Sequence, residues 1–189
     1  LMGVAWPGIR HQFQLPVDAL GIILVCGTAG YMLSSFLSGL LIRHLGIGGL
    51  LSLSCAAMAG TLLVYAVTPL WWVFVIFSAV GGLGAGAIDA GINTYIAKYH
   101  STRMMQWLHA SFGVGITSGP FIMTMGINAT SHWQSGYFVV SVAMVILYVI
   151  LNFANDMWEG ISASSRELDH DENNASISET IKSIKVLLN

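Results

Sequence analysis

The stretch GGLGAGAIDAGIN at residues 81–93 decides the fold of this chain, because it places one carboxylate, Asp89, among glycine, alanine and aliphatic side chains. If this stretch spans a membrane, an ionisable side chain there costs free energy and is usually kept for function. The meaning of Asp89 therefore depends on whether the surrounding sequence lies in a lipid bilayer.

The composition is that of an integral membrane protein. Hydrophobic residues make up 55% of the chain and charged residues 8%, with a mean hydropathy of +0.72, whereas soluble domains carry about 25% charged residues. The net charge of -2 gives no basic surface for nucleic acid. Cys26 and Cys55, both in apolar stretches, indicate neither a disulfide framework nor a zinc site, so we expect no metal and no cofactor.

Hydropathy along the chain predicts an all-α bundle with a clipped first helix and five full spans. The helical remnant covers residues 1–9, and the spans lie near 20–42, 48–67, 70–97, 107–127 and 137–154. The predicted connectors are residues 11–18, 43–47, 68–69, 98–106 and 128–136. Because these connectors are short, consecutive helices are expected to be antiparallel neighbours. Residues 1–154 are thus predicted to form an amino-terminal transmembrane bundle.

The basic residues predict the orientation of this bundle. Six of the seven fall on one side of the alternating topology, namely Arg43, Lys98, Arg103, Arg166, Lys182 and Lys185, and Arg10 falls on the other. Cytoplasmic loops carry an excess of Lys and Arg, so the amino terminus is predicted to be cytoplasmic, in the plasma membrane or an endomembrane. Asn128 in the sequence Asn128-Ala-Thr130 then lies outside, where it is a candidate for N-glycosylation.

A change of composition after residue 154 predicts a different kind of segment. Seven of the nine acidic residues lie between Asp156 and Glu179 among serine and asparagine. Residues 155–176 are therefore predicted to be an acidic cytoplasmic linker, serving as a tether or as a phosphorylated regulatory segment. Residues 177–189 have the spacing of an amphipathic helix that leads to another membrane segment. Six spans followed by a polar linker are typical of one half of a two-half transporter.

Four polar side chains are candidates for function. Asp89 and Asn93 share one face of the fourth span at a spacing of four residues, while His109 lies just inside the fifth span with Gln106 one turn before it. The carboxylate can take up a proton, accept hydrogen bonds from a polar substrate or bond a neighbouring helix. A neutral imidazole can hydrogen-bond a substrate or relay a proton, or it can simply pack between helices.

The glycines of these two spans are predicted to serve helix packing. Gly82 with Gly86, and Gly115 with Gly119, have the small-xxx-small spacing that lets helix backbones approach closely. A dinucleotide-binding loop is excluded because it requires a preceding strand in a soluble βαβ unit. No nucleophile, base and orienting residue occur together, so the chain is not expected to be an enzyme.

One motif resembles the major facilitator superfamily, whose members have two six-helix halves joined by a cytoplasmic linker. In that family the loop between helices two and three has the pattern G-x-L-A-D-[RK]-x-G-[RK]-[RK]. Here residues 39–48 are GLLIRHLGIG, so Gly39 and Gly46 agree with the pattern, whereas Arg43 occupies the acidic position.

The fourth and fifth spans resemble the fucose-permease-like sugar transporters of that superfamily. Their fourth helix has the pattern G-x-G-x-x-[ED]-x-x-x-N, found here as GAGAIDAGIN at residues 84–93, and their fifth has a polar residue ahead of S-F-G, found as HASFG at 109–113. The segment WPGIRHQF at 6–13 is similar to the end of their first helix. The resemblance covers residues 1–154 and implies the amino-terminal six-helix half of a twelve-helix bundle.

The resemblance implies roles for three of the polar residues. Asp89 takes the place of the family's protonatable carboxylate, and Asn93 and His109 line the central cavity. Gln106 is a further candidate for substrate binding because of its position one turn before His109. Bacterial relatives carry a second carboxylate where Gly3 stands, so coupling would rest on Asp89 alone or be lost.

The resulting prediction is a proton-coupled carrier of a monosaccharide that works by alternating access. Its partners would be the sugar, protons, the lipid bilayer and the carboxy-terminal half of the same transporter. Three alternatives remain open. They are an uncoupled carrier of another small polar solute, a transport-inactive nutrient sensor that signals through the linker, and a half-sized protein that dimerises.

Overall fold

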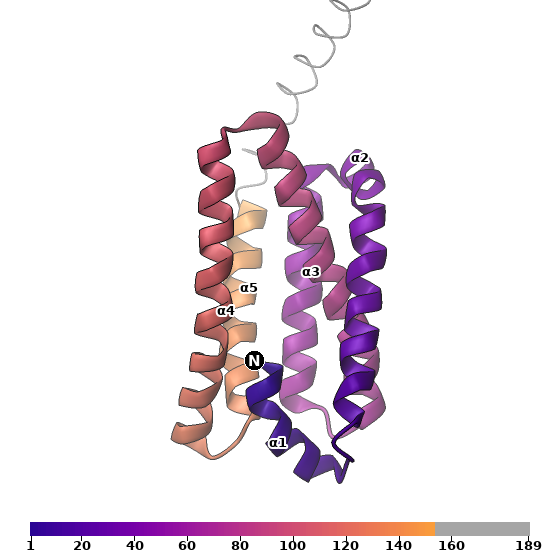
Figure 1. The fold of residues 1–189 in the computed structure, drawn as a ribbon, viewed down its shortest axis with the longest axis vertical. Helices are drawn as coiled ribbons and strands as arrows, with labels where there is room; N and C mark the ends of the chain where they lie inside the picture. Colours follow the sequence, from indigo (N-terminus) through magenta and orange to yellow (C-terminus); the bar gives the residue numbers. More distant parts are fainter. Residues whose placement is uncertain (154–189) are drawn as a thin grey trace, which may run out of the picture. The chain divides into compact units, whose positions relative to one another are not determined.

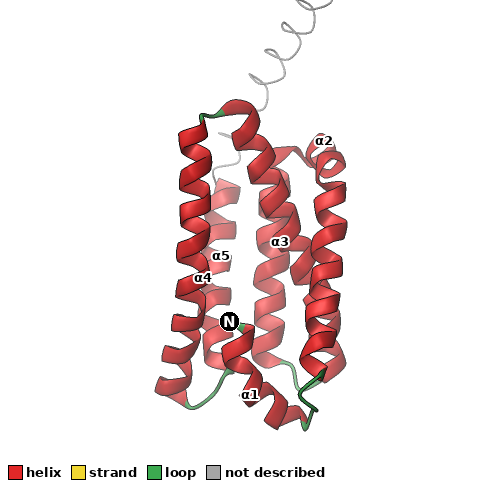
Figure 2. Cartoon of the chain, in the orientation of Figure 1, coloured by secondary structure: helices red, strands yellow, loops and turns green. Residues whose placement is uncertain are grey.

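The structure is a computed structural model that describes residues 1–153, and this part of the chain is helical throughout apart from short connections (Figures 1 and 2). Its helices are α1 (Met2–Phe13), α2 (Ala19–Val67), α3 (Trp71–Tyr99), α4 (Thr102–Thr130) and α5 (Gln134–Phe153). The four from α2 to α5 are long and apolar enough to cross a membrane. The expectation of an all-helical, multi-pass membrane protein is confirmed at this level.

Helix α2 contains both of the spans predicted at 20–42 and 48–67, so the described residues form five helices, with two of the predicted segments joined in α2. A straight helix of 49 residues would be about 74 Å long, more than twice the bilayer core of about 30 Å. The helix is instead interrupted at Gly46, which has φ 70° and ψ 172°. These angles are open essentially only to glycine. The predicted loop 43–47 is thus a break at a single residue.

The neighbours of α3 show that α2 reverses direction at Gly46. In the first arm of α2 (19–45), Gly27 faces Gly82 and Tyr31 faces Gly86, so this arm runs parallel to α3. In the second arm (47–67), the order is opposite, since Thr61 faces Gly81 and Leu50 faces Gly91. Helix α3 is therefore packed against two antiparallel arms.

Two other predicted connectors are shorter than expected. Helix α3 continues to Tyr99 and α4 begins at Thr102, so most of the predicted loop 98–106 is helical. Likewise α4 continues to Thr130 and α5 begins at Gln134, which places Asn128 in the last turn of α4, where it is exposed. Polar residues can continue a helix at these ends because water satisfies the terminal backbone groups that have no partner within the helix. Glycosylation of Asn128 stays a prediction.

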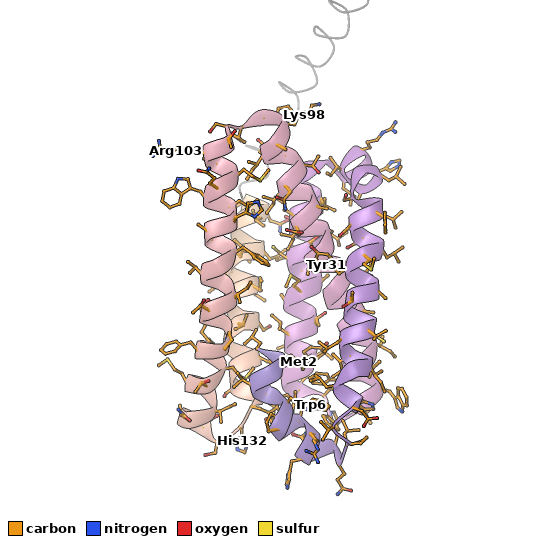
Figure 3. The ribbon with its side chains drawn as sticks, in the orientation of Figure 1. Met2, Trp6, Tyr31, Lys98, Arg103 and His132 are labelled. Atoms are coloured by element: carbon orange, nitrogen blue, oxygen red, sulfur yellow. The ribbon has the colours of Figure 1, made fainter. Side chains whose placement is uncertain are left out.

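An aromatic cluster closes one end of the bundle. Figure 3 shows Trp6 and His132 at this end, named here the His132 end, and Lys98 with Arg103 at the opposite, Lys98 end. The rings of Tyr65 and Phe74 stack with centroids 3.8 Å apart. The cluster consists of Trp6, Phe13, Tyr65, Trp71, Phe74, Trp133 and Tyr137. It joins α1, both ends of the α2–α3 connection and α5 into one hydrophobic core.

The acidic linker predicted at 155–176 and the amphipathic helix predicted at 177–189 lie outside the described residues.

Candidate functional site

Asp89 lies within α3 and accepts hydrogen bonds from two side chains. The Tyr31 hydroxyl, on the first arm of α2, donates to Oδ2 of Asp89. The Asn93 amide nitrogen, one turn further along α3, donates to Oδ1 at 3.0 Å and to the Asp89 backbone oxygen at 2.8 Å. No cation pairs with the carboxylate among the described residues, so both carboxylate oxygens are satisfied by uncharged donors.

Tyr31 can reach Asp89 because α2 and α3 cross at glycines. A Cβ at Gly82 would lie 2.0 Å from the carbonyl oxygen of Gly27, and a Cβ at Gly86 would lie 2.3 Å from that of Tyr31. Real Cβ atoms do not approach so closely, so no larger residue fits at either position in this arrangement. The backbone of Tyr31 therefore lies directly against α3. Asp89 follows Gly86 by three residues, which brings its carboxylate within reach of the phenol.

A cavity of about 410 Å³ lies between α1, the two arms of α2 and α3. Its polar lining residues are Thr28, Tyr31, Thr61, Tyr65 and Ser78. The hydroxyls of Thr61 and Ser78 donate to backbone oxygens of α3, at 3.4 Å to Phe77 and 2.7 Å to Val75. Both side chains are buried, whereas Thr28 and Tyr31 are exposed and can hydrogen-bond a solute. Tyr31 belongs both to this wall and to the Asp89 site, so it connects the two.

His109 and Gln106 occupy the first turns of α4, where both side chains are exposed. Within residues 1–153, no hydrogen bond joins either of them to Asp89 or Asn93. The structure therefore brings together two of the four predicted residues, Asp89 and Asn93, and adds Tyr31. Tyr31 could not be found from the sequence beyond its phenol in an otherwise apolar span, because its partner lies 58 positions further along the chain.

Comparison with known proteins decides the family. The family model described as Major Facilitator Superfamily matches residues 1–188 of this chain. The chain belongs to this superfamily. Its four helices that are long and apolar enough to cross a membrane, counted in residues 1–153, agree with this membership.

Two curated relatives of this major facilitator chain are named as sugar transporters. The Glucose/mannose transporter GlcP of Bacillus subtilis (strain 168) is 22% identical over 149 residues, which cover 78% of this chain and 37% of the relative. The Sodium-dependent glucose transporter 1A of Mus musculus is 24% identical over 141 residues, covering 71% and 33%. The chain thus spans about a third of the length of these relatives. No solved structure matches it significantly.

The family's loop motif lies at the turn of α2. Gly39 and Arg43 are exposed in the last turns of the first arm, and no atom outside the local helix lies within 4 Å of a Cβ built at Gly39. Gly46 is the break itself. Of the two motif glycines, Gly46 is thus the one whose backbone excludes other residues.

The second glycine pair of this major facilitator chain has a different setting from the first. A Cβ at Gly115 would meet nothing within 4 Å, and one at Gly119 would lie 3.6 Å from Cγ of Leu1. Among the described residues, Gly82 and Gly86 are therefore at a tight helix crossing, whereas Gly115 and Gly119 are not. Close packing at the second pair stays a prediction.

Proposed function

We propose that this chain forms one half of a secondary transporter that carries a monosaccharide by alternating access, coupled to protons at Asp89. Membership of the major facilitator superfamily supports transport, and the names of two relatives support glucose or a similar hexose as the substrate. In this proposal a carboxy-terminal half packs against the described helices in the bilayer, the amino terminus is cytoplasmic, and the two halves rock around a site near the midplane.

The observation that carries the proposal is the Asp89 carboxylate in a membrane-spanning helix, held by Tyr31 and Asn93 without a cation. Residues 1–153 contain only one other acidic residue, Asp18. A charge at membrane depth is costly. By binding a proton, Asp89 becomes neutral, and this lowers the free-energy cost of moving the site from one side of the membrane to the other. The same carboxyl releases the proton when it faces the side of lower proton concentration.

The substrate is proposed to bind beside this carboxyl. Both amide N–H groups of Asn93 point at Asp89, so its amide oxygen is the atom that accepts a hydrogen bond from a sugar hydroxyl. His109 and Gln106 carry donors and acceptors that are free to complete the ring of contacts. In the proposed cycle Asp89 binds a proton on the outside, the sugar binds against Asn93, His109 and Gln106, the halves rock, and both are released inside.

Replacing Asp89 by Asn in the full-length carrier tests the proposal. Uptake of labelled glucose or mannose is measured in vesicles with and without an inward proton gradient. We expect D89N to lose gradient-driven accumulation but to keep exchange of labelled for unlabelled sugar, because the neutral amide resembles the protonated acid. Asp18→Asn is the matched control, since Asp18 lies before α2 and makes no side-chain capping bond. Undiminished accumulation by D89N would show that Asp89 is not the proton site.

Sodium is the second candidate for the coupling ion, because one relative is named as sodium-dependent. A carboxylate is also a suitable ligand for a hard cation, although Na⁺ needs several further oxygen ligands. The same vesicles distinguish the two ions when a sodium gradient replaces the proton gradient. Accumulation with sodium alone would favour this candidate, and equal uptake with no gradient would indicate an uncoupled carrier. Absence of transport with every sugar tested would favour a nutrient sensor.

A further inference from the structure

We infer that Tyr31 is a positioning residue for ion coupling, whose hydroxyl holds the Asp89 carboxylate in its ionised form and loosens its hold when Asp89 binds a proton. The inference rests on the proposed function, because it assumes that Asp89 is the proton site. Under this inference α2 takes part in coupling through Tyr31, in addition to the polar residues of α3 and α4.

Tyr31 is held in place at the crossing of α2 and α3. Its backbone oxygen lies against Gly86 and accepts hydrogen bonds from Ser35 Oγ at 2.8 Å and Ser34 Oγ at 3.2 Å. The backbone is therefore fixed at the helix crossing, one turn of α3 before Asp89. The phenol extends from this fixed point to Oδ2 of Asp89.

The second arm of α2 and helix α4 also have residues near Asp89 in space or in sequence. The second arm of α2 meets this part of α3 through Leu50, Ser54 and Thr61, none of which titrates at accessible pH. On α4, Arg103 and His109 are the titratable residues nearest to Asp89 in sequence, and within residues 1–153 neither makes a hydrogen bond or an ion pair with it. Tyr31 is thus the titratable side chain from a neighbouring helix that bonds the carboxylate directly.

The strength of the hydrogen bond from Tyr31 to Asp89 depends on whether the carboxyl is ionised. A hydroxyl bound to an ionised carboxylate is held about twice as strongly as one bound to a neutral group. When Asp89 gains a proton from water, its oxygen atoms become weaker acceptors and one of them carries a hydrogen of its own. Protonation therefore weakens the link between the first arm of α2 and α3 without breaking any covalent bond.

Tyr31 also lies where a solute can reach its hydroxyl. Tyr31 is exposed by 37% and lines the cavity of about 410 Å³. A phenol released from Asp89 is free to hydrogen-bond a hydroxyl of the sugar that the proposed function places beside Asp89 and Asn93. Proton binding and solute binding are then favourable together, which is the requirement for symport.

Tyr31→Phe in the full-length carrier tests the inference, because it removes the hydroxyl and keeps the ring. The readout is the pH dependence of labelled glucose uptake. Without the donor, the ionised form of Asp89 loses a hydrogen bond, so gradient-driven uptake should extend to higher pH. We expect the midpoint of the pH profile to rise by about one unit, with both variants normalised to the amount of protein in the membrane. Tyr148→Phe is the matched control, since Tyr148 is a similarly exposed tyrosine on α5.

The double variant Y31F/D89N separates this inference from the proposed function. If Tyr31 acts through Asp89, the double variant has the same pH profile as D89N alone. A normal pH profile in Y31F together with a lost one in D89N would overturn the role of Tyr31 and leave the proposed function intact. Normal gradient-driven uptake in D89N would overturn both.

A spectroscopic measurement on the unmodified carrier covers the case in which Y31F does not fold. Infrared difference spectra during acidification report the C=O band of a protonated carboxyl and the C–O band of a tyrosine. We expect a tyrosine band to change at the same pH as the carboxyl band, and both changes to be absent in D89N. A carboxyl band that develops without any tyrosine change would overturn the inference.

Discussion

Gly82 of α3 lies so close to Gly27 of α2 that a Cβ at position 82 would be 2.0 Å from the Gly27 carbonyl oxygen. A second contact of this kind follows at Gly30, where a Cβ would lie 2.2 Å from the Ala79 carbonyl oxygen. In a bilayer, association between helices depends on such close packing, because lipid tails are as apolar as leucine side chains. The two helices are therefore held at the distance that lets Tyr31 reach Asp89.

Gly82→Ala should destabilise the protein, because the added methyl forces α2 and α3 apart. We expect a loss of about 2 kcal/mol, measured as a lower midpoint of thermal unfolding in detergent. Gly21→Ala is the control, since a Cβ at Gly21 meets nothing within 4 Å and the residue is helical. That variant should be neutral or slightly more stable, by up to about 1 kcal/mol. Equal midpoints for the two variants would contradict the tight crossing.

Gly46→Ala should also destabilise the protein, but through the backbone and not through a clash. No atom lies within 4 Å of a Cβ at this position, whereas its φ of +70° is strained for any residue with a side chain. Conformations of this kind cost about 1–3 kcal/mol. Gly60→Ala is the control, because that glycine is helical with equally open surroundings. Thermal unfolding should separate the two variants by at least about 1 kcal/mol, and no difference would mean that residue 46 is not the point of reversal.

Gln12→Leu should weaken the attachment of α1 to α5. The side-chain oxygen of Gln12 accepts hydrogen bonds from Trp133 Nε1 at 3.1 Å and from Gln134 Nε2 at 3.0 Å. Because Trp133 is buried, the loss of its acceptor should cost about 1–2 kcal/mol. Gln12→Glu keeps an acceptor oxygen and should recover most of the loss in a thermal unfolding assay. If the leucine variant is as stable as the parent, these two bonds contribute nothing to stability.

His109→Ala should affect transport and leave stability unchanged. The imidazole is exposed on α4 and makes no hydrogen bond within the described residues, so its removal should leave the unfolding midpoint within about 2 °C. If it binds the sugar, the KM for glucose should rise about tenfold, as expected for the loss of one hydrogen bond. Val114→Ala, at a position exposed by 68% on the same helix, should leave KM as it is. An unchanged KM in H109A would remove His109 from the proposed site.

Hydropathy predicted the positions of the helices well. Helix α3 was expected at 70–97 and lies at Trp71–Tyr99, and α5 was expected at 137–154 and lies at Gln134–Phe153. The reason is that membrane depth restricts the length and polarity of each span. The connectors were predicted less well, because polar residues such as Gln106 and Asn128 can end a span in hydropathy while the backbone remains helical.

The site was only partly predictable for a related reason. Asp89 and Asn93 are four residues apart, so helical geometry alone brings them together. Tyr31 and Asp89 meet through tertiary packing across 58 positions, and no local pattern contains that information. The short loop expected between α3 and α4 is present, with only residues 100–101 between the helices, but no hydrogen bond joins His109 to Asp89 within residues 1–153, so the part of His109 in the site stays a prediction.

The aromatic cluster packs α1, α2, α3 and α5 together at the His132 end of the bundle. Helices pinned together at one end move as levers, with the smallest displacement at the pin. A helix of 29 residues such as α3 is about 44 Å long, so a tilt of about 5° at the cluster moves its other end by about 4 Å. Small rotations that barely disturb the packed rings of Tyr65 and Phe74 thus become displacements at the Lys98 end that are larger than the diameter of a water molecule.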